Sequence, residues 1–550
     1  MSILFFTIFY FILSWLRLDY ALMFLFFSLP SYQIRFSLFG LPSNLLEIMV
    51  LVSFAVWLFK KTELLNYLFK PNRIKRFKNN KLKRVPYPFG MEIVLLLIIS
   101  FIAVAITGFS DSALGVWKAY FFEPILVFIL ILNVFQPPLS LPTRQAGLPL
   151  AKGEKKNEGM AKIIWPLALS ALILSSFAIY QKITGQFIFN PAWAEIGSRR
   201  ATSLFSYPNA LGLYLGPIIL VLVGFLSNRI SRFKDGQNEK RSFELRIKNY
   251  ELRISEKFLT VFVSLTVFIS LLAIYFAKSE GALIGIIAGL FVFGLLAGKR
   301  TRLATIIVSI ILGIGILAYQ PARDYAFTKI TLQDLSGEIR KQQWRETGEM
   351  LKDGLVISGT GLANYQIAIA PYHQEGIFFN SDNDPEFHRH VVWNEEYKKS
   401  HWQPVEIYLY PHNIFLNFWT ELGLAGMLLF VWIFFKYFLI SINNFKNSIH
   451  FVIAGSDPQS RNLNSAKTWI PDPVPAGRQE VRNDRKEGKV INNKFLNLGL
   501  IGAMVVIIIH GLVDVPYFKN DLAIIFWLLV AMISLIETNI RINANNTNKF

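Results

Sequence analysis

The chain has 550 residues, of which 53% are hydrophobic, and its mean hydropathy is +0.40. Many apolar runs approach the roughly 20 residues needed to cross a bilayer, which excludes an ordinary soluble protein and favours a polytopic, all-α membrane protein. The formal charge of +19 would suit a nucleic-acid partner. However, Lys and Arg gather between the apolar runs, as in cytoplasmic loops, so we expect contact with the lipid bilayer and no nucleic acid. The absence of cysteine excludes disulfides and thiolate metal sites.

The first part of the chain, residues 1–319, contains most of the apolar runs. Residues 3–29 are interrupted by Arg17 and Asp19, and we interpret them as one long broken span, with two short helices as the alternative. Basic or Pro/Gly-rich segments near 60–90, 136–162 and 228–257 are expected to be cytoplasmic linkers. The remaining spans are predicted at residues 44–59, 91–107, 114–135, 163–185, 208–226, 258–277, 281–297 and 303–319.

Residues 320–411 form the longest stretch between spans, and acidic residues outnumber basic ones in it. A helix is predicted over residues 338–351, followed by the Gly-rich segment SGTGLANY. Residues 412–550 then supply three spans, at 412–438, 498–513 and 521–536, with a polar insert at 443–494. When the spans are counted in this way, every short basic loop lies on the same side of the membrane. The sequence therefore predicts about 12 spans, with both ends cytoplasmic and one long extracytoplasmic loop between helices 9 and 10.

The segment YLYPHNIFLNFWTELGLAG opens polar and then becomes apolar. Proline suits a first helical position, so Pro411 is expected to start the helix and His412 to lie in its first turn. Asn413, Asn417 and Glu421 recur every four residues and should form one polar stripe. Ionisable groups in a membrane span are costly and indicate function. The alternative is that His412 only caps the helix at the membrane interface.

Other charged residues lie on the side predicted to be extracytoplasmic. Arg199 and Arg200 precede a span that opens with Pro208 and Asn209. They would suit a clamp for phosphate, which arginine grips in a bidentate manner, or simple contact with lipid headgroups. Lys278 and Ser279 form a tight turn between two spans. The alternative is that they have no function, because short turns between spans are ordinarily polar.

Two further segments contain candidate residues. Gly361 lies in GLVISGTGLANY, where the glycines could bind a ligand or only turn the chain, and no βαβ pattern supports a Rossmann fold. His510 and Asp514 are four residues apart in HGLVDVPYFKND, a spacing that permits contact on one helix face. No set of His, Asp and Glu has convincing metal-ligand spacing, and residues 388–390 (HRH) are interpreted as loop surface.

Four motifs occur in order: RRATSLFSYPN, a Ser-containing turn followed by Gly-Ala, R(x3)W…GTGLANY, and PHNIFLNFWTELGLAG. Together they resemble the O-antigen ligase and O-antigen polymerase family of bacterial envelope proteins. The resemblance covers most of the chain outside residues 136–162, 228–257 and 443–494.

The resemblance implies a metal-independent glycosyltransferase without a cofactor. Such an enzyme takes a glycan from an undecaprenyl-pyrophosphate carrier at the outer face of the bacterial cytoplasmic membrane. Its acceptor is a hydroxyl of lipid A-core, of another glycan repeat or of a protein. By this resemblance His412 matches the proposed base, Arg200 with Arg199 beside it matches the pyrophosphate ligand, and Arg340 matches an arginine early in the outer loop. Many relatives have Arg where this chain has Glu280, so a second phosphate contact there would fall to Lys278.

The chemistry agrees with the resemblance. Pyrophosphate is a good leaving group that needs positive charge nearby, and a sugar hydroxyl has a high pKa, so a positioned base helps. Ligase, polymerase and protein O-oligosaccharyltransferase activities all remain open from the sequence. A lipid-linked sugar transporter or flippase is the alternative from another class, although no internal repeat is visible. A purely structural membrane protein would not need outward arginines beside a helix-start histidine.

Overall fold

Long apolar helices make up the body of the molecule. The computed structural model describes residues 2–38, 41–68, 88–136, 158–237, 244–382, 384–454 and 493–547. Within these residues, nine helices are long and apolar enough to cross a membrane, and three shorter apolar helices accompany them. This confirms an all-α, polytopic membrane protein, whereas the total of about 12 spans stays a prediction. Most of the linkers predicted near 60–90 and 136–162, and of the insert at 443–494, lie outside the described residues.

The first half of the chain supplies the helices α1 (Ser2–Leu16), α2 (Leu18–Phe27), α3 (Leu45–Leu68), α4 (Gly90–Ile106), α5 (Asp111–Trp117), α6 (Glu123–Val134), α7 (Glu158–Thr184), α8 (Pro191–Ala194), α9 (Pro208–Gln237) and α10 (Glu244–Ala277). The second half supplies α11 (Glu280–Ala297), α12 (Lys299–Ala318), α13 (Gln320–Ile330), α14 (Leu335–Met350), α15 (Tyr365–Ile369), α16 (Phe387–Trp393), α17 (Glu395–Ser400), α18 (Ile414–Ala454), α19 (Lys494–Gly511) and α20 (Asn520–Thr547). Single turns of other helix types occur at η1 (Leu29–Gln33), η3 (Lys118–Phe122), η4 (Leu351–Leu355) and η5 (Ala370–Tyr372).

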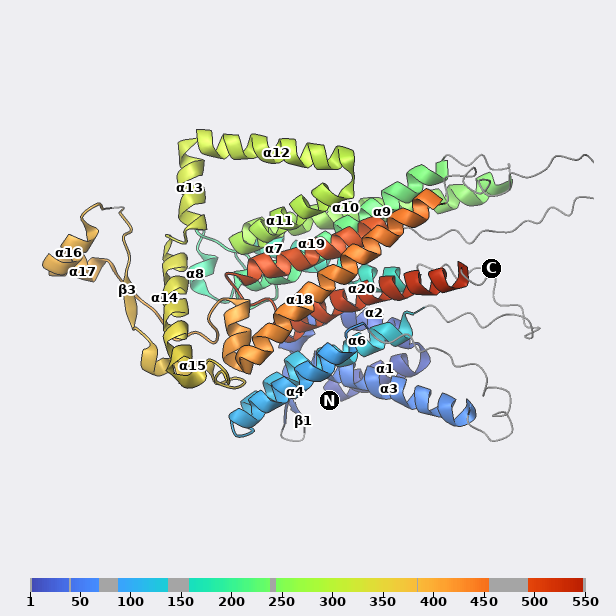
Figure 1. Cartoon of the computed structure of the whole chain (residues 1–550), viewed down its shortest axis with the longest axis horizontal. Coiled ribbons are helices and arrows are strands. Elements are labelled where there is room, and N and C mark those ends of the chain that lie inside the picture. Colours follow the sequence, from blue (N-terminus) through green and yellow to red (C-terminus); the bar gives the residue numbers. More distant parts are fainter. Residues whose placement is uncertain are drawn as a thin grey trace, which may run out of the picture.

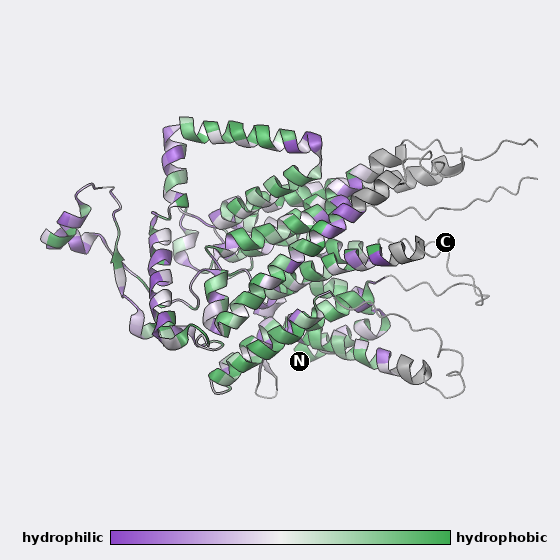
Figure 2. Ribbon diagram, viewed as in Figure 1, coloured by the Kyte–Doolittle hydropathy of each residue, from purple (hydrophilic) through white to green (hydrophobic). Residues whose placement is uncertain are grey.

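Strands are few in the described residues. β1 (Arg35–Leu38) pairs antiparallel with β2 (Leu41–Asn44), and β3 (Gly376–Phe378) pairs antiparallel with β4 (Trp402–Pro404), with Ile377 opposite Gln403. Figure 1 shows α14 crossing one end of the bundle, with β3, α16 and α17 projecting beyond it. Figure 2 shows that the bundle helices are mainly hydrophobic, whereas α13, α14, α16 and α17 carry many hydrophilic residues. We call the end of the bundle that α14 crosses the α14 end.

The first apolar stretch folds as two helices rather than as one broken span. Tyr10 Oη donates to Ala21 O at 3.0 Å, and the rings of Phe6 and Phe24 lie 6.2 Å apart. These contacts require α1 and α2 to run antiparallel. Arg17 lies at the turn with a non-helical backbone and pairs with Asp19 at 3.1 Å. The interpretation as a single span was wrong because this charged turn reverses the chain.

Close helix packing in the bundle depends on small residues. A Cβ on Gly224 of α9 would lie 2.6 Å from Cα of Gly499 on α19. Because neither residue has a side chain, the two backbones approach closely, as in many membrane bundles. α11 packs on both α9 and α19, so these three helices form a tight unit whose ends reach the α14 end.

Helix α18 is broken near its start. Gly423 has φ of 71° and ψ of −179°, which interrupts the helical hydrogen bonding. Residues 356–363, which we call the GTG loop, lie in the break. Leu424 N donates to Ile357 O at 3.1 Å, and Thr360 N donates to Thr420 O at 2.6 Å. The loop therefore satisfies backbone groups that the break would otherwise leave unpaired in an apolar setting.

Replacement of Gly423 by alanine should destabilise this junction. A Cβ there would lie 2.2 Å from Ile357 O, and the positive φ disfavours any side chain. We expect a loss on the order of 2–3 kcal/mol, seen as a lower midpoint of thermal unfolding in detergent.

Gly348→Ala is the matched control, because it lies within α14 and its Cβ would meet nothing within 4 Å. That variant should unfold at or slightly above the wild-type temperature. Equal midpoints for Gly423→Ala and the wild type would show that the break does not require glycine.

Candidate functional site

The segment that precedes α18 is attached to α14 by two hydrogen bonds. Trp344 Nε1 donates to Pro411 O at 2.8 Å, and Nδ1 of His412 lies 2.9 Å from Oε1 of Gln343. Gln343 is itself buried. With Oε1 as the acceptor, Nδ1 carries the ring proton and Nε2 keeps its lone pair. In the neutral ring this arrangement would leave Nε2 of His412 free to accept a hydrogen bond.

The helix begins later than the sequence suggested. Asn413 Oδ1 accepts from Phe415 N at 3.0 Å and Leu416 N at 3.1 Å, so Asn413 is the N-cap and the first helical residue is Ile414. The prediction that Pro411 and His412 lie in the first turn was wrong, as was the alternative of His412 as the cap. The asparagine side chain satisfies the first free N–H groups, and His412 takes a left-handed φ of 43° outside the helix.

Aromatic rings and charges surround His412. The rings of Tyr408 and Tyr410 meet its imidazole edge-on at 4.9 and 5.1 Å. Burial lowers the pKa of His412 below its usual 6.5, the charge of Arg340 lowers it further, and Asp514 opposes both effects. The neutral imidazole is thus favoured at neutral pH.

Arg340 lies one turn before Gln343 on α14, on the same side of the helix. Its Nη1 contacts Ser336 Oγ at 3.2 Å, while its buried Nε has no hydrogen-bond partner in the described part of the chain. An unsatisfied guanidinium N–H is costly unless a ligand accepts from it. Arg340 is therefore available to an anion close to His412.

Arg200 approaches the same region from the α8–α9 connection. Its Nε donates to Ala277 O at 2.9 Å and its Nη2 to Asn209 Oδ1 at 3.1 Å. Asn209 Nδ2 in turn lies 3.4 Å from Asp514 Oδ2. Burial lowers the pKa of Arg200, and the charge of Arg340 lowers it further. Glu280 acts in the opposite direction, so Arg200 lies within electrostatic range of both a negative and a positive group.

Arg199 points elsewhere. Its Nη1 donates to Lys182 O at 2.9 Å and Ile183 O at 3.1 Å, and its Nε donates to Ala194 O at 3.2 Å. These carbonyls include the last turn of α7, which a cation stabilises. The structure thus separates two arginines that are adjacent in sequence, since only Arg200 contacts Asn209.

Neighbouring residues of the turn between α10 and α11 also have different surroundings. Lys278 is exposed and its Nζ lies 3.4 Å from Ser198 O. Ser279 is fully buried and its Oγ has no partner among the described residues. Glu280 pairs with Lys329 of α13 at 2.7 Å and accepts from Tyr325 Oη at 2.7 Å. Glu280 therefore anchors α13 to the start of α11.

The remaining predicted residues support the fold around His412. Glu421 is buried and accepts from Ala363 N of the GTG loop at 2.6 Å, and Gly361 packs on α4 with φ of 82°. His510 is buried against Gly281. α19 ends at Gly511, so the prediction that Asp514 shares a helix face with His510 was wrong, because the chain turns before reaching it.

Sequence reasoning missed several members of the site. Gln343 orients His412, and Tyr207 Oη lies 3.1 Å from Tyr410 Oη, linking the start of α9 to the segment before α18. Tyr410 lies within a motif already singled out, but its partner Tyr207 is 203 residues away, so nothing local indicates the pair.

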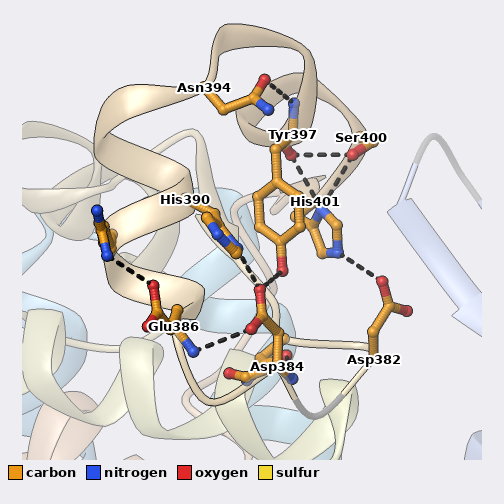
Figure 3. A network of polar contacts seen from close by, with 10 residues as sticks. Asp382, Asp384, Glu386, His390, Asn394, Tyr397, Ser400 and His401 are labelled. Atoms are coloured by element: carbon orange, nitrogen blue, oxygen red, sulfur yellow. Dashed lines mark hydrogen bonds and ion pairs between the residues drawn. The ribbon is translucent and has the colours of Figure 1, made fainter.

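The projecting lobe, formed by β3, α16 and α17, has its own polar network, which Figure 3 shows. His390 Nδ1 lies 2.6 Å from Asp384 Oδ2, which also accepts from Tyr397 Oη at 2.8 Å. His401 Nε2 lies 3.1 Å from Asp382 Oδ2, and its ring stacks on Tyr397 at 3.9 Å. These pairs tie α16 and α17 to the preceding loop. Across the described ranges, no group of three or more His, Asp or Glu residues is placed to hold a metal ion.

An apolar cavity of about 540 Å³ adjoins the Arg200 segment. Its walls come from α2, η1, α7 and the residues on either side of α8. Ser203 and Leu204, which follow Arg200 closely, line it together with Phe177, Phe187 and Phe189. An apolar chain could thus lie beside the cationic groups.

Comparison with protein families gives one match. Residues 265–431 fit the family described as O-antigen ligase. The matched region includes Arg340, the GTG loop, His412 and the break in α18, but not Arg200 or Asp514. No curated protein matches the chain.

The titration of His412 tests this electrostatic description. Its NMR-detected midpoint should lie below 6.5 because burial disfavours the charged imidazolium. Arg340→Met should raise the midpoint, since a neighbouring positive charge is lost. Asp514→Asn should lower it, since a negative charge that favours imidazolium is lost.

Lys399→Met serves as the control for charge removal, because Lys399 is exposed on α17 in the projecting lobe. It should leave the His412 midpoint unchanged. A midpoint at or above 6.5 in the wild-type protein would contradict the buried environment described for His412.

Proposed function

Because residues 265–431 assign this chain to the O-antigen ligase family, we propose that it is a membrane glycosyltransferase. Its donor is a glycan on an undecaprenyl-pyrophosphate carrier, and its acceptor is a hydroxyl group. The reaction takes place at the outer face of the bacterial cytoplasmic membrane, at the α14 end of the bundle. The observation that carries the proposal is that His412 is bonded to Gln343, one turn along α14 from Arg340, whose buried Nε has no partner among the described residues.

The acceptor hydroxyl attacks the anomeric carbon of the donor sugar. A carbon–oxygen bond forms there as the bond from that carbon to the pyrophosphate oxygen breaks, and the bonding electron pair leaves with the pyrophosphate. Nε2 of His412 takes the hydroxyl proton, which general base catalysis requires. Displacement in one step inverts the anomeric configuration.

Arg340 and Arg200 stabilise the charge that develops on the leaving pyrophosphate. Guanidinium groups suit this role because they remain charged and donate several hydrogen bonds to phosphate oxygens. Arg199 is left out of this step, since its donors already serve the end of α7. The apolar cavity beside Ser203 and Leu204 suits the first isoprene units of the carrier.

The position of the polar groups favours a transferase over a transporter. Arg200, Arg340 and His412 lie in connections and on α14 at one end of the bundle, whereas transporters bind their substrates near the middle of the membrane. A panel of lipid A-core, free glycan repeat and peptide as acceptors separates ligase, polymerase and protein glycosylation activities.

Variants of the full chain in detergent should separate the proposed roles. With an undecaprenyl-pyrophosphate oligosaccharide as donor, His412→Ala should lower turnover by about 10²–10⁴-fold because the base is lost. Arg340→Met should lower it by about 10²–10³-fold because leaving-group stabilisation is lost. Release of undecaprenyl pyrophosphate gives the rate.

Lys399→Met should retain the wild-type rate, and Arg199→Met should mainly lower the thermal midpoint. Unchanged turnover in folded His412→Ala protein would exclude His412 as the base. Movement of the lipid-linked sugar across liposome membranes, with no transfer to any acceptor, would favour the transporter.

A further inference from the structure

Lys519 lies between α19 and α20, at the edge of the proposed active site. Its Nζ is 3.8 Å from the centre of the Tyr207 ring. Tyr207 Oη lies 3.1 Å from Tyr410 Oη, and the Tyr410 ring contacts His412 at 5.1 Å. Two aromatic side chains therefore connect the lysine to the proposed base.

The ammonium group of Lys519 is not paired with another side chain or with a carbonyl in the described residues. No side chain or carbonyl in the described ranges hydrogen-bonds or ion-pairs with Nζ, so the ring face of Tyr207 is the interaction that holds it. Burial lowers the pKa of Lys519 to about 8, while Asp521 and Asp514 act in the opposite direction. The Nζ atom of Lys519 is not among the fully buried polar atoms, so its three N–H donors are open to water or to a ligand.

The neighbouring acids do not neutralise it directly. Asp514 accepts from Asn209 and from Val515 N, at 3.4 and 2.8 Å. Both carboxylate oxygens of Asp521 are buried without a partner among the described residues. Direct pairing of Lys519 with either acid would be favourable, yet the amine instead lies over the tyrosine ring.

We infer that Lys519 is a third cationic contact for the pyrophosphate group of the donor, in addition to Arg340 and Arg200. The inference rests on the proposed function. A pyrophosphate group presents more acceptor oxygens than two arginines with partly occupied donors can satisfy, and lysine binds phosphate as a compact point charge. Cation–π contact with Tyr207 positions the amine without consuming its N–H donors.

The competing role is structural. Lys519 could serve only to balance the charges of Asp514 and Asp521, in which case its loss would reduce stability and leave ligand affinity unchanged. A binding measurement with a short carrier analogue distinguishes the two roles, and it does not depend on turnover.

The probe is farnesyl pyrophosphate, titrated into purified full-length protein in detergent, with farnesyl monophosphate for comparison. Lys519→Met should weaken binding of the pyrophosphate about tenfold or more, as expected for a lost charge-assisted hydrogen bond. The loss for the monophosphate should be smaller. Lys519→Arg should restore most of the affinity, and Lys399→Met should bind as the wild type does.

Wild-type affinity in Lys519→Met would overturn the inference, as would an absence of pyrophosphate binding to the wild type. Equal losses in the Met and Arg variants together with a lowered thermal midpoint would assign Lys519 the structural role and also overturn it. If Lys519-dependent binding occurs but no acceptor is glycosylated, the contact stands and the proposed function fails. If glycan transfer occurs while Lys519→Met retains full affinity and turnover, the function stands and the contact fails.

Discussion

The break in α18 is the constraint on which the rest of the site depends. A helix interrupted in an apolar bundle leaves backbone groups that must find partners, because lipid supplies none. The GTG loop supplies them through Ile357 and Thr360, and Ala363 N of the same loop donates to the side chain of Glu421. This loop follows α14 and η4 in the chain, so filling the break also fixes α14 across the end of the bundle (Figure 1). The position of α14 then determines where His412 lies.

Electrostatics explains why an anion would bind here. The charge of Arg340 lowers the pKa of both Arg200 and His412, while Glu280 and Asp514, respectively, act in the opposite direction. Like charges held together in this way are unfavourable until a negative ligand arrives. The charge of Arg340 also favours the neutral form of His412, which is the form that accepts a proton. In the proposed mechanism, substrate binding and base catalysis would therefore depend on the same arrangement of arginines.

Much of the architecture was predictable from the sequence. Long apolar runs identify membrane helices because the bilayer thickness sets their length. The helix predicted over residues 338–351 corresponds to α14, and the Gly-rich segment after it forms the GTG loop, with positive φ at Gly359 and Gly361. His412 is bonded to Gln343 of α14, the helix that also carries Arg340, whereas the chemical roles of His412 and Arg340 stay predictions.

The rest depends on contacts between distant segments. Arg199 and Arg200 look alike in sequence, and only the carbonyls at the end of α7 distinguish them. The start of α18 could not be located because Pro411 and Asn413 are both good helix-start residues, and here the asparagine cap prevails. The reversal at Arg17 depends on a hairpin that hydropathy alone does not reveal. Tyr207, Tyr410 and Lys519 come from three separate connections.

The most direct measurement is an electron cryomicroscopy structure of the full chain with undecaprenyl pyrophosphate bound. The account predicts density for the pyrophosphate between Arg340 and Arg200, with Nε2 of His412 facing the open side where the acceptor would enter. Isoprenoid density should continue into the cavity beside Ser203 and Leu204. Pyrophosphate bound away from these arginines, or a lipid path through the middle of the bundle, would contradict the assignment of this site.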